Sequence, residues 1–387
     1  MRRAMALPAW IWLPALGNAV FAGLTTPALP LLLAGRGESK PVIATFFVLN
    51  AASAAVLNLT AGSQLRRRGF PRRWVYACPA AAALATAVVA GTGARWPVFA
   101  AGTVMMGMSL VFPALVGLAS GFPDRSVAGT VATLRTVFVL GYLAGLGAFS
   151  LVAAALSSAA APVWVAAGVA GATAFAAALR PVATGPATGG PGVAEDRPAP
   201  RPTPAPLLVA AVGAVLLLRA ADSLRMVYLP LYAVATAAPK PLVAGLFGVT
   251  AAVEVVVLTP LSRLAERLGS RPALAGIAAT GTLSFLVVAL GAGGPALIGS
   301  QVVYAVFAAG FQSVGMVLLG DCLRSGSGGG ASLFTAVVQT GSMVGIVAPL
   351  MVPGFTVRTF WIGAGFCTLA AVLLLRGITA PSRTTCR

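Results

Sequence analysis

The sequence predicts an all-α polytopic membrane protein in which twelve transmembrane helices form two pseudo-symmetric six-helix bundles. Composition, the number of apolar stretches and an internal repeat lead to this prediction. Of the 387 residues, 58% are hydrophobic and 9% are charged, and the mean hydropathy is +0.94. Soluble domains carry about 25% charged residues, so this chain has too few polar residues to cover a water-soluble body. The composition therefore excludes a soluble enzyme and a disordered protein.

Apolar stretches recur along the whole chain, and twelve of them approach the roughly 20 residues that a helix needs to cross a bilayer. We expect spans at residues 8–33, 41–65, 74–93, 97–120, 127–156, 162–179, 207–234, 242–264, 272–291, 295–319, 330–352 and 357–376.

The basic residues predict the orientation of these spans. With both termini in the cytoplasm, the inner segments hold 18 of the 26 Lys and Arg residues, the outer segments hold five, and three lie within spans. Basic residues gather on the cytoplasmic side of membrane proteins, so this bias supports cytoplasmic termini. The basic loops are better suited to anionic lipid than to nucleic acid. Arg outnumbers Lys by 24 to 2, which is typical of a high-G+C bacterium, and we expect a multi-pass protein of the bacterial cytoplasmic (inner) membrane.

A Pro-rich segment divides the chain into halves. We expect an N-terminal bundle at residues 1–180, a cytoplasmic linker at 181–206, and a C-terminal bundle with a short tail at 207–387. The halves repeat at an offset of 200 residues, where Leu29-Pro30-Leu31 matches Leu229-Pro230-Leu231, Lys40-Pro41 matches Lys240-Pro241, and Phe47 matches Phe247. Duplicated halves are how many secondary transporters build a substrate site near the middle of the membrane.

The basic loop after the second span (LRRRGFPRR, 65–73) has a counterpart after the eighth (AERLGSRP, 265–272). With the spans, the repeat and the central linker, these loops resemble the major facilitator superfamily over residues 8–376. The resemblance implies a transporter that works by alternating access, with gating-loop candidates Arg66, Gly69, Arg73, Arg263, Glu266, Arg267, Gly269 and Arg271. The first loop departs from the family pattern, because Gly62-Ser63-Gln64 stand where an aspartate is often found.

Residues 130–145, 248–271 and 320–345 are similar to the bacterial sugar efflux branch of this superfamily. Arg135 matches an arginine of the fifth helix in that branch, and Glu254 matches an acidic residue of the eighth. Gln339 departs from the branch, which tends to place an arginine there. The resemblance therefore implies efflux without fixing sugar as the substrate.

Charged residues inside spans are costly and are functional candidates by default. Asp222 lies near the middle of the seventh span, with Arg219 and Arg225 three residues away on either side and on roughly one helix face. This triplet predicts a substrate or proton site. Alternatively, the arginines only offset the charge of Asp222 and so make the helix tolerable in the membrane. Two arginines favour an ionised carboxylate, which argues against easy protonation.

Two other charged residues lie within spans. Glu254 has no basic residue within reach on its own helix, which suits a proton carrier; the alternatives are a structural hydrogen bond, or a salt bridge to Arg225 or Arg135. Arg135 lies about two turns into the fifth span. It could bind an anionic or polyhydroxyl substrate, or its side chain could extend to the cytoplasmic headgroups.

Uncharged polar residues complete the candidate cavity. Asn18, Asn50 and Gln339 belong to spans 1, 2 and 11, and the resemblance implies that spans 1, 5, 7 and 11, with their neighbours, line the pathway. Tyr228 on the seventh span could stack on a ligand. For each of these residues, a hydrogen bond between helices is an equally good interpretation.

The chain has no His, and its four Cys are scattered without a CxxC pair. No catalytic or nucleotide-binding motif is found, so we expect no enzyme activity, no cofactor and no metal.

The sequence predicts a monomeric secondary transporter whose partners are a small-molecule substrate, protons and membrane lipids, with no nucleic acid. Proton-coupled efflux (antiport) of a sugar, secondary metabolite or drug-like molecule is the first hypothesis. An importer or uniporter on the same fold is the alternative, and a non-transporting membrane sensor is a remote one.

Overall fold

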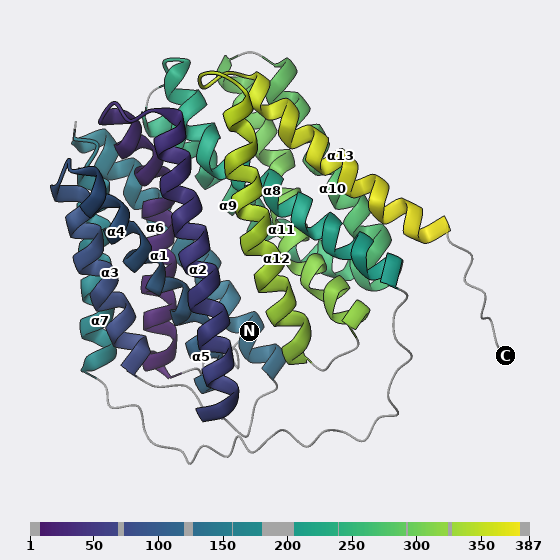
Figure 1. Ribbon diagram of the computed structural model, residues 1–387, viewed down its shortest axis with the longest axis horizontal. Helices are drawn as coiled ribbons and strands as arrows, with labels where there is room; N and C mark the ends of the chain where they lie inside the picture. The colour runs from purple at the N-terminus through teal and green to yellow at the C-terminus, as the bar shows by residue number, and fades with distance from the viewer. Residues whose placement is uncertain are drawn as a thin grey trace. The chain divides into compact units, whose positions relative to one another are not determined.

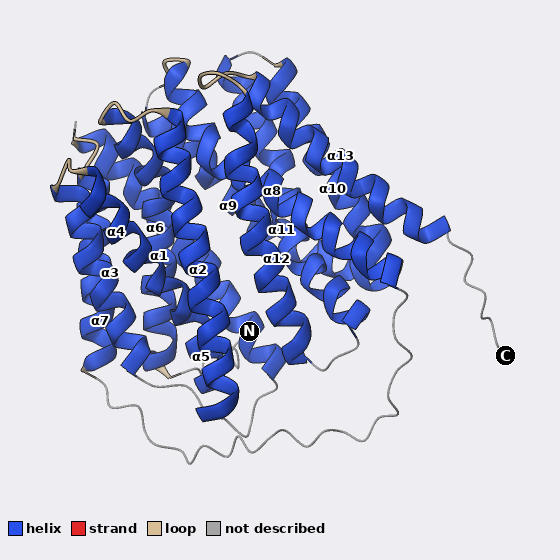
Figure 2. Cartoon of the chain, viewed as in Figure 1, coloured by secondary structure: helices blue, strands red, loops and turns tan. Residues whose placement is uncertain are grey.

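The computed structural model describes residues 8–68, 73–119, 127–156, 158–179, 205–238, 240–291, 293–323 and 327–379. These residues form α-helices joined by short turns, with no strand among them (Figure 2). The N-terminal helices are α1 (Ala9–Gly35), α2 (Lys40–Arg68), α3 (Arg73–Gly91), α4 (Arg95–Met105), α5 (Val111–Ala119), α6 (Val127–Ala155) and α7 (Ala161–Ala178). The C-terminal helices are α8 (Ala205–Ala235), α9 (Lys240–Leu268), α10 (Ser270–Leu290), α11 (Gly293–Leu323), α12 (Ser327–Val347) and α13 (Arg358–Thr379). Short 3₁₀ helices, η1 (Met106–Leu110) and η2 (Ala348–Met351), follow α4 and α12.

The helices confirm the predicted all-α polytopic fold. Among the described residues, ten helical segments are long and apolar enough to span a membrane. Two shorter apolar stretches lie in α9 (Gly245–Val257) and in the second half of α12 with η2 (Ala336–Met351). Every predicted span therefore corresponds to a helical segment of the structure (Figure 1).

The fourth predicted span is interrupted, which the apolar pattern did not predict. The 3₁₀ turn η1 separates α4 from α5, and Pro113 is the third residue of α5. A proline has no N–H to donate, and its ring clashes with the carbonyl four residues earlier. For Pro113 that carbonyl belongs to Ser109, inside η1, so the proline accounts for the change of helix type.

Contacts divide the chain into two compact units. One comprises Met1–Pro198 with Pro239–Gly248, and the other comprises Ala199–Ala238 with Val249–Arg387. In the first unit, α1 packs against α6 and α7, and α3 packs against α7. In the second, α8 packs against α12 and α13, and α10 packs against α11 and α13.

The two units repeat the same packing at an offset of 200 residues. Helices α2 and α9 begin at Lys40 and Lys240, and α6 and α12 begin at Val127 and Ser327. Gly145 of α6 faces the Val20 carbonyl of α1, and Gly345 of α12 faces the Ala220 carbonyl of α8. A Cβ atom at either glycine would overlap that carbonyl, so the missing side chain lets the two backbones touch.

In the first unit, an arginine ties the end of α1 to the end of α3. Arg36 Nη2 donates hydrogen bonds to the carbonyls of Val89 at 2.8 Å and Ala90 at 3.0 Å. These carbonyls lie in the last turn of α3, where no helical N–H remains to pair with them. Burial lowers the pKa of Arg36, and the nearby Glu38 carboxylate acts in the opposite direction.

Candidate functional site

A buried polar cluster lies within the second unit, where α8 meets α11 and α12. The Asp222 side chain of α8 has no solvent exposure and forms an ion pair with Arg219, one helical turn earlier. Its other carboxylate oxygen accepts a hydrogen bond from the Tyr304 hydroxyl of α11. Both oxygens of this buried carboxylate therefore have a partner, which offsets much of the cost of burying the charge.

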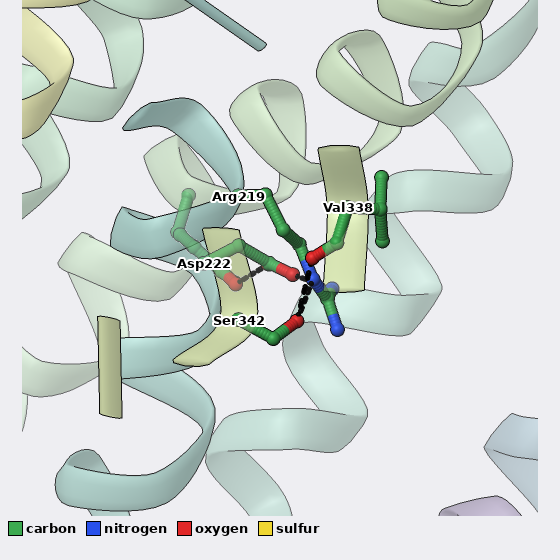
Figure 3. Close-up of polar contacts among 5 residues, drawn as sticks. Arg219, Asp222, Val338 and Ser342 are labelled. Carbon is green, nitrogen blue, oxygen red and sulfur yellow. Dashed lines mark hydrogen bonds and ion pairs between the residues drawn. The ribbon is translucent and has the colours of Figure 1, made fainter. Parts of the chain in front are cut away.

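Arg219 extends this cluster to α12. Its Nε donates a hydrogen bond to Ser342 Oγ at 2.7 Å, and the Ser342 hydroxyl in turn donates to the Val338 carbonyl at 2.9 Å. Figure 3 shows Arg219 between the Asp222 carboxylate and Ser342. The Arg219 side chain keeps 28% of its surface exposed, while that of Asp222 keeps none. Arg219 is therefore the exposed partner of the ion pair.

Arg225 is held by a different set of groups, on α10 and α11. Its Nε donates to Gln301 Oε1 at 3.2 Å, and its Nη2 donates to Ser300 Oγ at 2.7 Å. The guanidinium carbon lies 4.4 Å from the ring centre of Tyr304 and 5.3 Å from that of Phe285. Cations are attracted to aromatic faces at these distances, so Tyr304 contacts Arg225 with its ring and Asp222 with its hydroxyl.

The structure separates the arginines that the sequence placed beside Asp222. Arg219 pairs with the carboxylate, whereas no carboxylate among the described residues lies within ion-pair distance of Arg225. Arg225 is therefore not a salt-bridge partner of Glu254, which lies half-buried on α9. Tyr228 does not face an open cavity: it is buried, and its hydroxyl donates to the Ile346 carbonyl at 2.7 Å.

The other cavity candidates are scattered. Asn18 is buried on α1, and Gln339 is half-buried on α12. Asn50 on α2 is buried against α4; with its amide nitrogen turned toward the carbonyls, it donates to Gly102 at 3.1 Å and Phe46 at 3.3 Å. Asn50 thus makes the hydrogen bond between helices that the sequence left as an alternative. The side chain of Arg135 lies outside the described residues.

The gating-loop candidates fall at helix ends. Arg73 begins α3 and is exposed, as are Arg263, Glu266 and Arg267 near the end of α9. Gly269 caps α10 with φ +88°, a conformation that favours glycine. Arg271 Nη2 donates to the Leu207 carbonyl of α8 at 3.2 Å. The Arg66 side chain and Gly69 lie outside the described residues.

Sequence reasoning did not select four members of the cluster, namely Ser300, Gln301, Tyr304 and Ser342. The repeat contains a signal that could have found three of them. Ser300, Gln301 and Tyr304 lie on one face of α11, and the residues 200 positions earlier are Ala100, Ala101 and Val104. Likewise, Arg219 and Asp222 correspond to Ala19 and Ala22. The same packing therefore exists in the first unit without this ion pair.

Removing the Tyr304 hydroxyl should lower the stability of the protein. In Tyr304→Phe, the ring still faces Arg225 but one Asp222 oxygen loses its donor, which costs about 1–3 kcal/mol for a buried group. The measurement is thermal unfolding of the detergent-solubilised protein. Tyr232→Phe is the matched control, because Tyr232 lies on α8 and packs its ring against Phe360. Equal melting temperatures for Tyr304→Phe and the control would contradict a contribution from this hydrogen bond.

Comparisons with known proteins bear on the fold. No protein-family model matches the sequence, and no curated protein matches it. Solved structures do match. Two structures of the nucleoside transporter NupG have a TM-score of 0.76, with 14% and 13% identity; they cover 95% and 97% of this chain, and the match covers 98% and 100% of theirs. The peptide transporter POT matches with a TM-score of 0.73 and 12% identity, over 96% of this chain and 94% of that one. The chain therefore has the same fold as these nucleoside and peptide transporters.

Proposed function

We propose that this protein is a secondary active transporter that exports a small polar or drug-like molecule by alternating access, in exchange for protons. The fold it shares with a nucleoside transporter and a peptide transporter supports transport. The observation that carries the proposal is the Arg219–Asp222–Tyr304 cluster, a buried ionisable group in a membrane-spanning helix. Because the equivalent positions Ala19 and Ala22 allow the same helix packing, this helix pair does not require the ion pair in order to pack.

Asp222 suits proton coupling because its negative charge attracts side chains on α8 and α11. Arg219 on its own helix and Tyr304 on α11 face the carboxylate, and Arg225 lies over the Tyr304 ring. Protonation would remove the attraction for Arg219, which also bonds Ser342 on α12. The proton therefore weakens a polar tie between α8 and α12, and re-ionisation restores it. Glu254 on α9 is the second candidate for the proton-carrying group.

Several classes of compound are candidate substrates. The resemblance of residues 130–145, 248–271 and 320–345 to sugar efflux proteins favours a sugar or a secondary metabolite, exported from a bacterial cytoplasm. The structural neighbours add nucleosides and peptides to the compounds worth testing. Import or facilitated diffusion on the same fold is the alternative.

Proton release from inverted membrane vesicles tests this function. A pH-sensitive dye reports the recovery of an imposed gradient while sugars, nucleosides, dipeptides, antibiotics and cationic dyes are added in turn. We expect one class to cause recovery in the wild type. Asp222→Asn should abolish this recovery, and loss in Glu254→Gln instead would assign the proton to Glu254. Glu38→Gln is the matched control, because Glu38 pairs with Arg95 outside the spans. No recovery with any compound, while a labelled one still equilibrates, would replace antiport by facilitated diffusion.

A further inference from the structure

The Arg225 side chain carries hydrogen-bond donors that no described residue accepts from. Arg225 is fully buried, yet its Nη1 has no hydrogen-bond partner in the described part of the chain. The neighbouring Gln301 is 1% exposed, and its Nε2 also lacks a partner. Buried donors are nearly always paired in native proteins, so two unpaired donors on two contacting side chains point to a missing acceptor.

The net charge of the cluster also indicates that an acceptor is missing. Arg219 and Asp222 neutralise each other, so one positive charge remains on Arg225. The rings of Tyr304 and Phe285 and the oxygens of Ser300 and Gln301 stabilise this cation, but none of these groups carries a negative charge. A buried cluster with a net positive charge is unfavourable in a membrane-spanning segment. The acceptor that is missing is therefore best supplied by an anion.

The first unit has no counterpart of this polar pair. The residues 200 positions before Arg225 and Gln301 are Thr25 and Ala101. An arginine also offers more than charge, because its planar guanidinium binds carboxylate and phosphate oxygens with paired donors. The aromatic faces and Ser300 fix the orientation of that plane.

We infer that Arg225 and Gln301 recognise an oxyanion, a carboxylate or phosphate group, on the transported molecule. This inference rests on the proposed function and narrows its substrate to an anionic small molecule. Arg225 Nη1 and Gln301 Nε2 donate to the oxyanion, whose charge neutralises the cluster. Because Arg225 has no exposed surface here, the ligand binds in a conformation in which α8 has moved away from its neighbours.

Binding can be measured without transport, by thermal unfolding of the full-length protein in detergent at constant ionic strength. The probes are inorganic phosphate and succinate as oxyanions, and glucose and uridine as neutral compounds. We expect an oxyanion at about ten times its Kd to raise the melting temperature by about 2–4 °C, and the neutral compounds to have no effect. A response to only one oxyanion tells whether the group is a phosphate or a carboxylate.

The decisive variant is Gln301→Glu, which places a carboxylate where Arg225 Nε already finds an oxygen. This variant should melt at or above the wild-type temperature without ligand, because Arg225 gains a counter-charge, and it should lose the response to oxyanions. Arg358→Gln, which removes an exposed arginine from the start of α13, should respond like the wild type. An oxyanion response that persists in Gln301→Glu, or its absence from the wild type, overturns the inference. Neither result depends on proton coupling, so the proposed function is judged separately by the vesicle assay.

Discussion

Replacing Asp222 with asparagine should abolish proton-coupled transport and destabilise the protein. Asparagine cannot carry the proton that the proposed mechanism assigns to this carboxylate. The change also leaves Arg219 without its ion-pair partner beside the buried cation of Arg225. Breaking a buried pair by removing one partner typically costs about 3–5 kcal/mol. We expect no substrate-dependent recovery of the dye signal in inverted vesicles, and a melting temperature well below that of the wild type.

Because loss of folding alone would also stop transport, a second variant separates the two effects. The double variant Arg219→Gln with Asp222→Asn removes both charges and keeps side chains that can bond each other. The first unit shows that this helix pair packs without charges at Ala19 and Ala22. The double variant should therefore melt closer to the wild type than Asp222→Asn, yet show no proton coupling. Proton coupling in the double variant would remove Asp222 from the mechanism and leave Glu254 as the candidate.

Replacing Gly345 with alanine should destabilise the second unit. A Cβ atom at this position would overlap the Ala220 carbonyl, and because the atoms it would meet are backbone atoms of Ala220, there is little room for relaxation. Overpacking of this kind typically costs about 1–3 kcal/mol. Thermal unfolding and the yield of folded protein measure the effect, and Gly145→Ala should show a similar loss because Gly145 makes the equivalent contact with Val20.

The control for this prediction is a helical glycine in open space. Gly365 of α13 has nothing within 4 Å of its would-be Cβ atom. Alanine there should be neutral or stabilising, since alanine is favoured over glycine in helices by about 1 kcal/mol. If Gly345→Ala and Gly365→Ala melted at the same temperature, close backbone contact between α8 and α12 would be ruled out.

Much of the fold could be predicted because hydropathy and the repeat are properties of the sequence itself. The expected spans at 41–65 and 242–264 correspond to α2 and α9, whose starts differ by 200 residues as the repeat requires. The break between α4 and α5 was missed because the apolar pattern runs through it. Its cause, Pro113, acts on backbone hydrogen bonds and leaves hydropathy unchanged.

The candidate site was only partly predictable for a different reason. The Arg219–Asp222 pair follows from spacing along one helix, because residues three apart lie on one face. The partners of Arg225 lie on α10 and α11, and the sequence of α8 contains no information about which faces those helices present. The contacts of Tyr304 and Gln301 with Arg225 therefore emerged only from the three-dimensional structure. Comparing the halves position by position would have singled out both, because their counterparts are Val104 and Ala101.

The single unbalanced charge on Arg225 has an electrical consequence. A charge that moves through the whole membrane potential changes in energy by about 2.3 kcal/mol per 100 mV, and a partial movement changes it in proportion. Arg219, Asp222 and Arg225 all belong to one spanning helix, Ala205–Ala235. Any step that shifts this helix along the membrane normal therefore moves net positive charge when the oxyanion site is empty and none when a monovalent anion fills it. The empty and loaded forms of the protein would then respond differently to membrane voltage.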